Sequence, residues 1–514
     1  MAAAVVVAAV FFLLATLPPS PFSVSLDGVS QDLLHRTIRG AYHIHTTRSD
    51  GARSKGVVAT AAARAGLQFA IFTDHGDGTR APDAPAYIDG VLCIDGVEIS
   101  TNGGHYVALD LPAAPYPLGG EAAAVVEDVR RLGGFGIAAH PDHPKQELAW
   151  TDWSAPIDGL EWLNADAEWR TEGRLALART LFAYVFRPAP ALASVFDRPA
   201  KTLERWDAAS RDRRVIALAA LDAHGGAWTP SGENGESRVI AGPSYDASFK
   251  ALSNRVVVGR PLTGDAAMDA RAVLGAIEAG LVYSVVDAIS PDVVLNVDSQ
   301  RIGPASSLPA GADSATIRGE SGQRLEIRAQ HAPGDPPVPW VLTNWIAPGG
   351  QRARPLEPAD TVGESIPQVP AGDWHVEKDA ASTGQVTSGE SVMALGYELA
   401  GNPRRSQYVA AALPISQPQP FRAIAFRGKA SRPMRVSVQL RFPEEEGRWV
   451  KSVYLDQQTR DVVVHVTSLK PAERSGGAMP SPSTARSLLF VVDLVNSRPG
   501  DRGEFQISDL RFGR

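Results

Sequence analysis

YHIHTTRSDG, residues 42–51, is the stretch that decides how the sequence is interpreted. Its first residues are predicted to lie at the end of a strand. On a strand the side chains of His43 and His45 point the same way and can bind one ion together. Asp50 follows in the predicted loop, from which its carboxylate can reach an adjacent ion. The stretch therefore predicts the first part of a metal site.

Similar polar groups recur along the N-terminal half, mostly where a predicted strand ends. Eight of the eleven histidines precede residue 289. Each motif alone is weak, because a single histidine after a strand is usually a hydrogen-bonded loop residue. Functional residues of parallel α/β barrels gather at the carboxyl ends of the strands, so the set together predicts one metal centre. The further candidate residues are His75, Glu98, His105, His140, Asp222 and His224.

Residues 37–288 alternate short apolar runs with helical stretches. Residues 69–72, 136–139 and 215–218 have the composition of buried strands, and helix-like stretches such as 56–65 and 121–132 precede them. Residues 175–213 have a helical composition interrupted by prolines, which is typical of an insertion. Buried strands that alternate with helices predict a parallel α/β sheet or barrel.

The order HxH…SDG, TDH, E, GH, AHP, DxH over residues 37–288 resembles the PHP (polymerase and histidinol phosphatase) superfamily, and within it the exported CehA/McbA-type group. The resemblance implies a distorted (β/α)7 barrel that holds two or three divalent ions, Mn, Fe or Zn. Ala41 and Tyr42 precede His43 where the family often has an aspartate and an apolar residue. Gly76 follows His75 where asparagine is common, and neither departure removes a ligand.

Carried over residue by residue, the resemblance implies three ligand sets. Glu98 would bridge the first two ions, and the three sets would be His43, His45, Glu98 and Asp222, then Glu98, His105 and His140, then Asp50, His75 and His224. Glu98 and Asp222 would also be catalytic, together with Arg48, whose charge suits a substrate oxyanion or a solvated loop. Asp74 is expected to orient a ligand rather than to bind metal. Asp142 and His143 are expected to lie in an exposed loop near His140.

The function that this pattern predicts is metal-dependent hydrolysis, most simply of a phosphate ester by a metal-bridging hydroxide. Divalent ions outweigh the charge of three carboxylates, so the site should attract a small anionic ester. A carboxylic ester, carbamate or amide hydrolase on the same cluster is the alternative enzyme. A non-catalytic exported glycan-binding protein is the alternative from another class, and the complete set of ligands argues against it.

Charge and composition exclude several other classes. The net charge of −7 and the lack of a Lys/Arg-rich run argue against a nucleic-acid partner. Cys93 is the only cysteine, so an intramolecular disulfide and a cysteine zinc site are excluded. Residues 1–25 begin with an apolar stretch that ends at two prolines, which predicts a signal peptide or an N-terminal anchor. The protein is therefore expected to be exported, periplasmic or secreted, and membrane-bound only if this segment is not cleaved.

The C-terminal half has a different composition. Helical periodicity fades after residue 289, and period-two strands with Pro/Gly-rich turns replace it. We expect a small β-sandwich over residues 289–365 and a jelly-roll, galactose-binding-like domain over residues 366–514. The predicted fold is thus α/β followed by two β-sandwich modules, and the last module is a candidate for carbohydrate binding.

Overall fold

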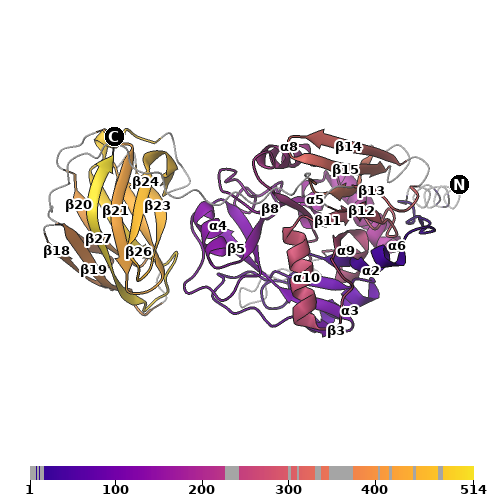
Figure 1. Ribbon diagram of the computed structural model, residues 1–514, viewed down its shortest axis with the longest axis horizontal. Helices are drawn as coiled ribbons and strands as arrows, with labels where there is room; N and C mark the ends of the chain where they lie inside the picture. The colour runs from indigo at the N-terminus through magenta and orange to yellow at the C-terminus, as the bar shows by residue number, and fades with distance from the viewer. Residues whose placement is uncertain are drawn as a thin grey trace. The chain divides into compact units, whose positions relative to one another are not determined.

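The computed structural model describes residues 7, 11, 17–225, 242–298, 302–308, 312–329, 337–346, 374–389, 391–402, 406–415, 420–443, 447–472 and 479–513. The predicted signal peptide or anchor, residues 1–25, therefore lies largely outside the described residues. The chain divides into two compact units (Figure 1). Unit 1 comprises Met1–Pro112 and Val126–Arg354, and unit 2 comprises Ala113–Val125 and Pro355–Arg514.

Unit 1 contains a nine-stranded mixed sheet. The strands β1, β2 and β4 pair in parallel, whereas the other neighbours are antiparallel. In sheet order the strands are β14 (Asp313–Gly319), β15 (Gly322–Ala329), β16 (Val338–Thr343), β11 (Val282–Val285), β10 (Ser253–Val257), β1 (Thr37–Ala41), β2 (Phe69–Phe72), β4 (Val91–Asp95) and β3 (Ala86–Ile88).

A second sheet of unit 1 has five strands. Its last three strands are parallel, and its first two pairings are antiparallel. In order they are β5 (Val97–Thr101), β6 (Gly104–Leu109), β7 (Phe135–Ala138), β8 (Gly159–Asn164) and β9 (Ile216–Ala220). The predicted strands at 69–72, 136–139 and 215–218 correspond to β2, β7 and β9, so these predictions are confirmed.

The two sheets join at two isolated parallel bridges. One bridge pairs His75, just beyond β2, with Glu98 of β5, and the other pairs Ile44, just beyond β1, with Ala223, just beyond β9. The chain also passes directly from β4 into β5 through Gly96, where a Cβ would lie only 2.8 Å from the carbonyl oxygen of Ala108. These connections bring the ends of strands from both sheets to one place.

Nine helices are described in unit 1 and at its border with unit 2. Val273 and Ile277 of α10 pack into the apolar core beneath the strands, as expected for a helix that covers a sheet. The predicted helical stretch 175–213 contains most of α6 together with α7 and α8. The helices are α2 (Gln31–Arg36), α3 (Lys55–Arg64), α4 (Ala122–Arg131), α5 (Ala165–Thr171), α6 (Arg174–Phe186), α7 (Pro188–Ala193), α8 (Ala200–Ala209), α9 (Tyr245–Ala251) and α10 (Ala266–Glu278).

Residues 289–346 differ from the expectation of a separate small sandwich. Their main strands, β14 to β16, continue the nine-stranded sheet because β16 pairs with β11. Two short strands, β12 (Leu295–Val297) and β13 (Ile302–Pro304), form a hairpin of their own. Period-two patterning identifies strands of this kind, but it does not say which sheet they join. The described residues therefore contain one β-sandwich rather than two.

Unit 2 is that sandwich, and the antiparallel β fold predicted for the last region is confirmed. The aromatic rings of Phe426, Phe490 and Phe505 lie in the core between its two sheets. One sheet has the order β17 (His375–Lys378), β20 (Tyr408–Pro414), β26 (Ser487–Asp493), β22 (Met434–Arg441), β23 (Arg448–Leu455) and β25 (Lys470–Pro471). The other has the order β18 (Thr383–Ser388), β19 (Val392–Glu398), β27 (Arg502–Gly513), β21 (Ala423–Ala430) and β24 (Arg460–His465).

The segment Ala113–Val125 belongs to unit 2 although it lies between β6 and β7 in the chain. The carboxylate of Glu121 accepts a hydrogen bond from the backbone N–H of Ser452 and pairs with Lys451. The side-chain amide of Asn496 donates to the carbonyl oxygen of Pro117. The described part of the chain has no helix with both the length and the apolar character needed to span a bilayer.

Candidate metal centre

All nine predicted ligands lie together where the two sheets of unit 1 join. Four of them follow the parallel strands β1 and β2, which pair with each other. Two lie within β5 and β6, and the others follow β7 and β9. In chain order these nine residues are His43, His45, Asp50, His75, Glu98, His105, His140, Asp222 and His224.

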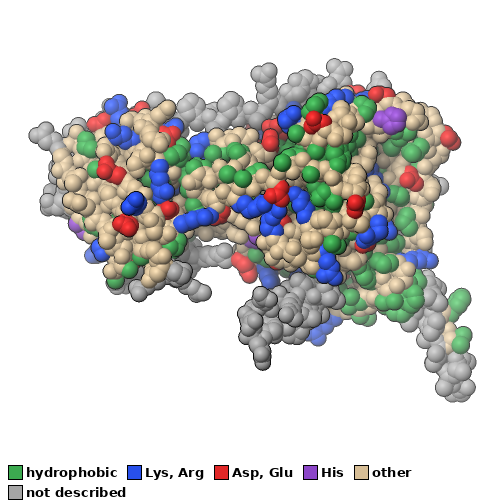
Figure 2. Space-filling view, turned by 90° about the horizontal axis from the view of Figure 1, so that it is seen from below, with side chains coloured by type: hydrophobic (Ala, Val, Ile, Leu, Met, Phe, Trp, Pro, Cys, Tyr) green, Lys and Arg blue, Asp and Glu red, His purple; other side chains and the backbone are tan. Residues whose placement is uncertain are grey.

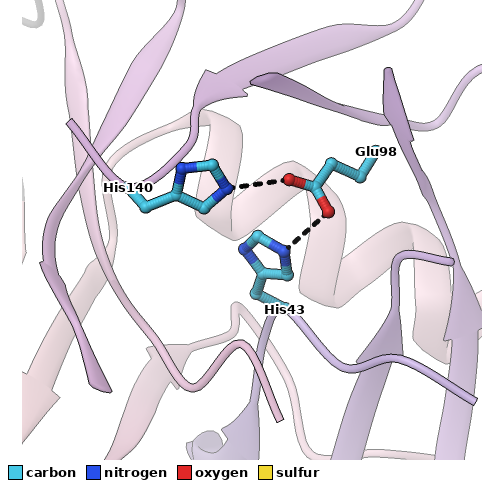
Figure 3. A group of neighbouring side chains, drawn as sticks. All are labelled: His43, Glu98 and His140. Atoms are coloured by element: carbon cyan, nitrogen blue, oxygen red, sulfur yellow. Dashed lines mark hydrogen bonds and ion pairs between the residues drawn. The ribbon is translucent and has the colours of Figure 1, made fainter. Parts of the chain in front are cut away.

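The carboxylate of Glu98 lies at the middle of the cluster and is 1% exposed. Its Oε1 lies 2.7 Å from Nδ1 of His105 and 2.9 Å from Nε2 of His140. Its Oε2 lies 3.1 Å from Nε2 of His43 and 3.2 Å from Nε2 of His45. Figure 3 shows His43 and His140 approaching different oxygens of this carboxylate. Glu98 thus has the geometry of a group shared between two ligand sets.

His43, His45 and Asp222 form the corner of the cluster beside Glu98. The two Nε2 atoms lie 3.1 Å apart, and Oδ1 of Asp222 lies 3.1 Å from that of His45 and 3.5 Å from that of His43. These three residues form one of the groups whose ligand atoms lie close enough to hold a single ion. Together with Glu98 they are the four residues expected for the first ion.

Asp50, His75 and His224 lie on the more exposed side. Oδ2 of Asp50 is 3.2 Å from Nε2 of His224 and 3.6 Å from Nε2 of His75. The other nitrogen of His75 lies 3.3 Å from Oε2 of Glu98. His75 therefore faces both Asp50 and Glu98, and it also forms a group with Glu98 and His105. The cluster is continuous, and His75 connects the parts that were expected to be separate sets.

The predicted ligand atoms are arranged to bind cations, because several hydrogen-bond acceptors face one another. Nδ1 of His43 lies 2.6 Å from Oε1 of Glu161, so a hydrogen on Nδ1 is donated there. Nε2 of His43 then presents a lone pair to two carboxylate oxygens and to Nε2 of His45. Such converging acceptors repel one another unless a positive charge lies between them. Imidazole and carboxylate are the donors that Mn, Fe and Zn accept, so the residues present could hold these ions.

Three of the nine residues have backbone conformations that L-residues rarely adopt. The φ angles are 63° for His43, 30° for His140 and 49° for Asp222. Non-glycine residues in this left-handed region are strained by roughly 1–3 kcal/mol each, and such strain concentrates at functional sites. All three residues follow directly or closely on a strand, so the strained turn redirects the side chain into the cluster.

Several imidazoles of the cluster hold extra protons when no ion is bound, because neighbouring carboxylates raise their pKa values. Burial by itself would lower the pKa of His45, but hydrogen bonds with Asp222 and Glu98 raise it to about 10. Burial opposes the ionised form of Glu98 as well, yet His43 and the other imidazoles bring its pKa well below the usual range. Protons on the imidazoles therefore take the place that metal ions would occupy.

Metal uptake is expected to release protons, with an affinity that increases with pH. His45 is protonated up to about pH 10 in the metal-free protein, so an ion must displace its proton below that pH. Each displaced proton makes the apparent affinity rise about tenfold per pH unit. Titration calorimetry in two buffers of different ionisation enthalpy measures the number released. An affinity that stays constant between pH 6 and about 9 would contradict this expectation.

Glu161 is a buried residue of the site that was not among the predicted ligands. One oxygen accepts from His43, and the other accepts the backbone N–H of His140 at 2.7 Å and the amide of Asn164 at 2.8 Å. The amide of Asn164 also lies 3.4 Å from Asp222. Glu161 thus fixes the orientation of two neighbours of Glu98. A charged residue in the middle of the apolar strand GLEWLN, residues 159–164, is the signal that could have identified it.

Replacing Glu161 with glutamine is expected to weaken metal binding without unfolding the protein. The amide keeps the shape but removes the charge that holds the hydrogen on Nδ1 of His43. Loss of such an outer partner typically costs roughly 10–100-fold in metal affinity or activity. The metal affinity or the turnover of Glu161→Gln should fall by this factor. Metal affinity equal to that of the unaltered protein would show that Glu161 does not orient His43.

Several neighbours lie outside the cluster of nine. Asp74 accepts hydrogen bonds from Thr46 and Ser49, so it shapes the loop that carries Asp50 and joins no candidate metal group among the described residues. Arg48 pairs with Asp83 and Asp95 and does not line the cavity, which argues against the predicted contact with a substrate oxyanion.

His143 is buried beside the cluster, not in an exposed loop as expected, whereas Asp142 is exposed. The ring of His143 lies 5.5 Å from that of His140, and its Nδ1 accepts the backbone N–H of Lys145. The side chain of Asp142 accepts a hydrogen bond from Thr202. Neither residue joins a candidate metal group among the described residues.

A cavity of about 680 Å³ opens onto the cluster. Glu98, His140 and Asp222 line its inner end. Lys145, Trp169 and Arg170 contribute to its walls, and Arg170 lies over the ring of Trp169 and pairs with Asp166. Volumes of this size accommodate small organic molecules. The cluster is therefore accessible to a small ligand.

No family model matches the sequence, and no curated protein matches it. Among solved structures the chain resembles the family 11 carbohydrate-binding module of the cellulase Lic26A-Cel5E of Clostridium thermocellum, at 15% identity and a TM-score of 0.23, over 30% of this chain and 97% of that one. It also resembles this module in complex with a mixed-linked tetrasaccharide, at 14% identity, a TM-score of 0.22, and 29% and 93% coverage. A third match is TmCBM61 in complex with galactotriose, at 13% identity, a TM-score of 0.19, and 28% and 90% coverage.

Proposed function

We propose that the protein is a metal-dependent hydrolase of the PHP type, and that its substrates are small phosphate esters. The single observation that carries this proposal is the position of Glu98, whose two oxygens each face different histidines. A buried carboxylate shared in this way is suited to bridge two divalent ions. The export and the glycan binding inferred from the sequence remain parts of the proposal.

The arrangement of unit 1 also supports the PHP proposal. The strands β1, β2 and β5 to β9 follow one another around a ring if the bridges His75–Glu98 and Ile44–Ala223 are counted as links. Seven strands in such a ring are compatible with the distorted barrel that the resemblance implies. The ligands lie at one end of this ring, as functional residues do in related folds.

The chain's own residues have distinct roles in this proposal. When bound, the divalent ions supply Lewis acidity and acidify coordinated water. Glu98 would supply negative charge to two ions and Asp222 to one of them, and Glu161 keeps the hydrogen of His43 away from the centre. Lys145 adds positive charge to the cavity wall, where it favours an anionic ester over a neutral one, whereas the charge of Arg170 is balanced by Asp166.

The deciding experiment combines metal analysis with a substrate panel. Purified protein should carry at least two equivalents of Mn, Fe or Zn and should hydrolyse a phosphomonoester or phosphodiester faster than a carboxyl ester, carbamate or amide. Removal of metal by a chelator should abolish turnover, and added metal should restore it. Protein with less than about one equivalent after reconstitution would refute the metal centre. Faster turnover of a carboxyl ester or carbamate would identify the alternative hydrolase.

A further inference from the structure

Helix α6 (Arg174–Phe186) carries large apolar side chains that point to solvent. Four residues form what we call the α6 face, and their exposed fractions are 86% for Leu175, 55% for Leu181, 75% for Val185 and 53% for Phe186. They are four of the ten large hydrophobic residues that are exposed in the described part of the chain. In Figure 2 apolar side chains gather at the end of unit 1 that carries α6 in Figure 1.

The opposite side of α6 is already buried. Thr180 and Ala183 pack against the rest of unit 1. A helix that is apolar on all sides is usually buried on all sides, because exposed apolar surface is unfavourable in water. A concentration of large apolar side chains on one face marks a surface that contacts a partner or a membrane. No described residue of unit 1 covers the α6 face, so we expect an apolar partner there.

The charged side chains of α6 itself are positive. The helix contains Arg174 and Arg179 and no acidic residue, and Arg187 follows it directly. Apolar side chains bordered by arginine are suited to a bilayer surface that contains anionic lipids, since the chains enter the headgroup region and the guanidinium groups meet phosphate. Two copies of this face would instead bring the arginines of both molecules together, which disfavours a symmetric dimer.

The start of the chain leads to the same end of α6. The guanidinium group of Arg187 donates a hydrogen bond to the carbonyl oxygen of Pro18. Residues 1–17 precede this point and contain no charged side chain. A segment of that composition favours lipid over water. The apolar N-terminal sequence is thus followed by a residue, Pro18, that contacts Arg187 at the end of α6.

We infer that the α6 face is a membrane-surface contact that rests on anionic lipid. The helix lies on the bilayer with its buried side toward unit 1, and Arg174 and Arg187 lie near its two ends. This contact is independent of the metal centre and of any hydrolytic activity.

The test places an environment-sensitive fluorophore on the α6 face of the full chain. Cys93 is buried, so a cysteine introduced as Val185→Cys can be labelled selectively, and Leu175→Cys provides a second position at the other end of the helix. Ser388→Cys on β18 is the exposed control. Vesicles of phosphatidylcholine with phosphatidylglycerol should shift the emission to the blue and increase it several-fold at both α6 positions and leave Ser388 unchanged.

Three results would overturn the inference. Emission at positions 175 and 185 that does not respond to anionic vesicles would show that the face does not contact lipid. Emission that is already blue-shifted without vesicles and does not depend on protein concentration would show that the chain's own N-terminal segment covers the face. A blue shift that grows with protein concentration in the absence of lipid would identify a second copy as the partner. A circular dichroism spectrum equal to that of the unaltered protein shows that each labelled variant is folded.

Discussion

Replacement of Glu98 with glutamine is expected to remove most of the bound metal and most of the turnover. The carboxylate lies within 3.3 Å of five imidazoles, and the amide carries neither the negative charge nor a second equivalent oxygen. Two ligand sets are weakened at once, so the loss should exceed the roughly 10–100-fold that follows from removing an outer partner. Added metal should not restore the rate.

His143→Ala is the matched control for Glu98→Gln. His143 lines the same cavity and lies beside His140, yet its Nδ1 is engaged by the backbone of Lys145. Its removal should leave the metal content unchanged and affect turnover only mildly. Turnover and bound metal are measured for both variants on protein that circular dichroism shows to be folded. If Glu98→Gln keeps its metal and His143→Ala loses it, the assignment of the ligands is wrong.

A chain that ends at Asp287 is expected to lose the folded metal centre, whereas a chain that ends at Ile346 should keep it. The difference is β14 to β16, which cover the edge of β11 and include the fully buried Trp340. Loss of one such core side chain typically costs about 3–5 kcal/mol, and the shorter chain loses far more than one.

Asn344, which follows β16, connects β14 to β16 directly to the strands that carry the site. Its side chain accepts from the backbone N–H of Ala217 and donates to the carbonyl oxygens of Ala217 and Val282. It therefore ties β9, which precedes Asp222 and His224, to β11. Asn344→Ala leaves these buried groups without partners, at about 1–3 kcal/mol each.

Thermal unfolding and metal content of both shortened chains and of Asn344→Ala test this expectation. The chain ending at Asp287 should not unfold cooperatively, and Asn344→Ala should have a lowered melting temperature. A cooperative, metal-loaded protein ending at Asp287 would show that residues 288–346 are dispensable for the site.

The positions of the ligands could be predicted because they depend on local patterns. His43 and His45 are two residues apart just beyond β1, and His75 and His140 closely follow the apolar strands β2 and β7. Glu161 could not be predicted in the same way, since its function depends on His43, which is 118 residues away in the sequence. Its polar character was visible, but its partner was not.

Sheet membership was less predictable than strand positions. The residues of β15 and β16 alternate as expected for antiparallel strands, and that pattern fits an independent sandwich as well as the edge of an existing sheet. The choice is made by long-range contacts, such as those of Asn344 with β9 and of Trp340 with the carbonyl oxygen of Ser290. Side-chain hydrogen bonds of this kind leave no periodic signal in the sequence.

The place of Ala113–Val125 in unit 2 has a consequence for the order in which parts of the protein fold. A ribosome releases Glu121 330 residues before Lys451, and it releases Pro117 379 residues before Asn496. Domains generally fold as units from the N-terminus onward during translation. We expect this chain to depart from that rule, because the loop between β6 and β7 packs only with the later strands of unit 2. Nascent chains should therefore expose this loop to chaperones and proteases until the strands of unit 2 have been made.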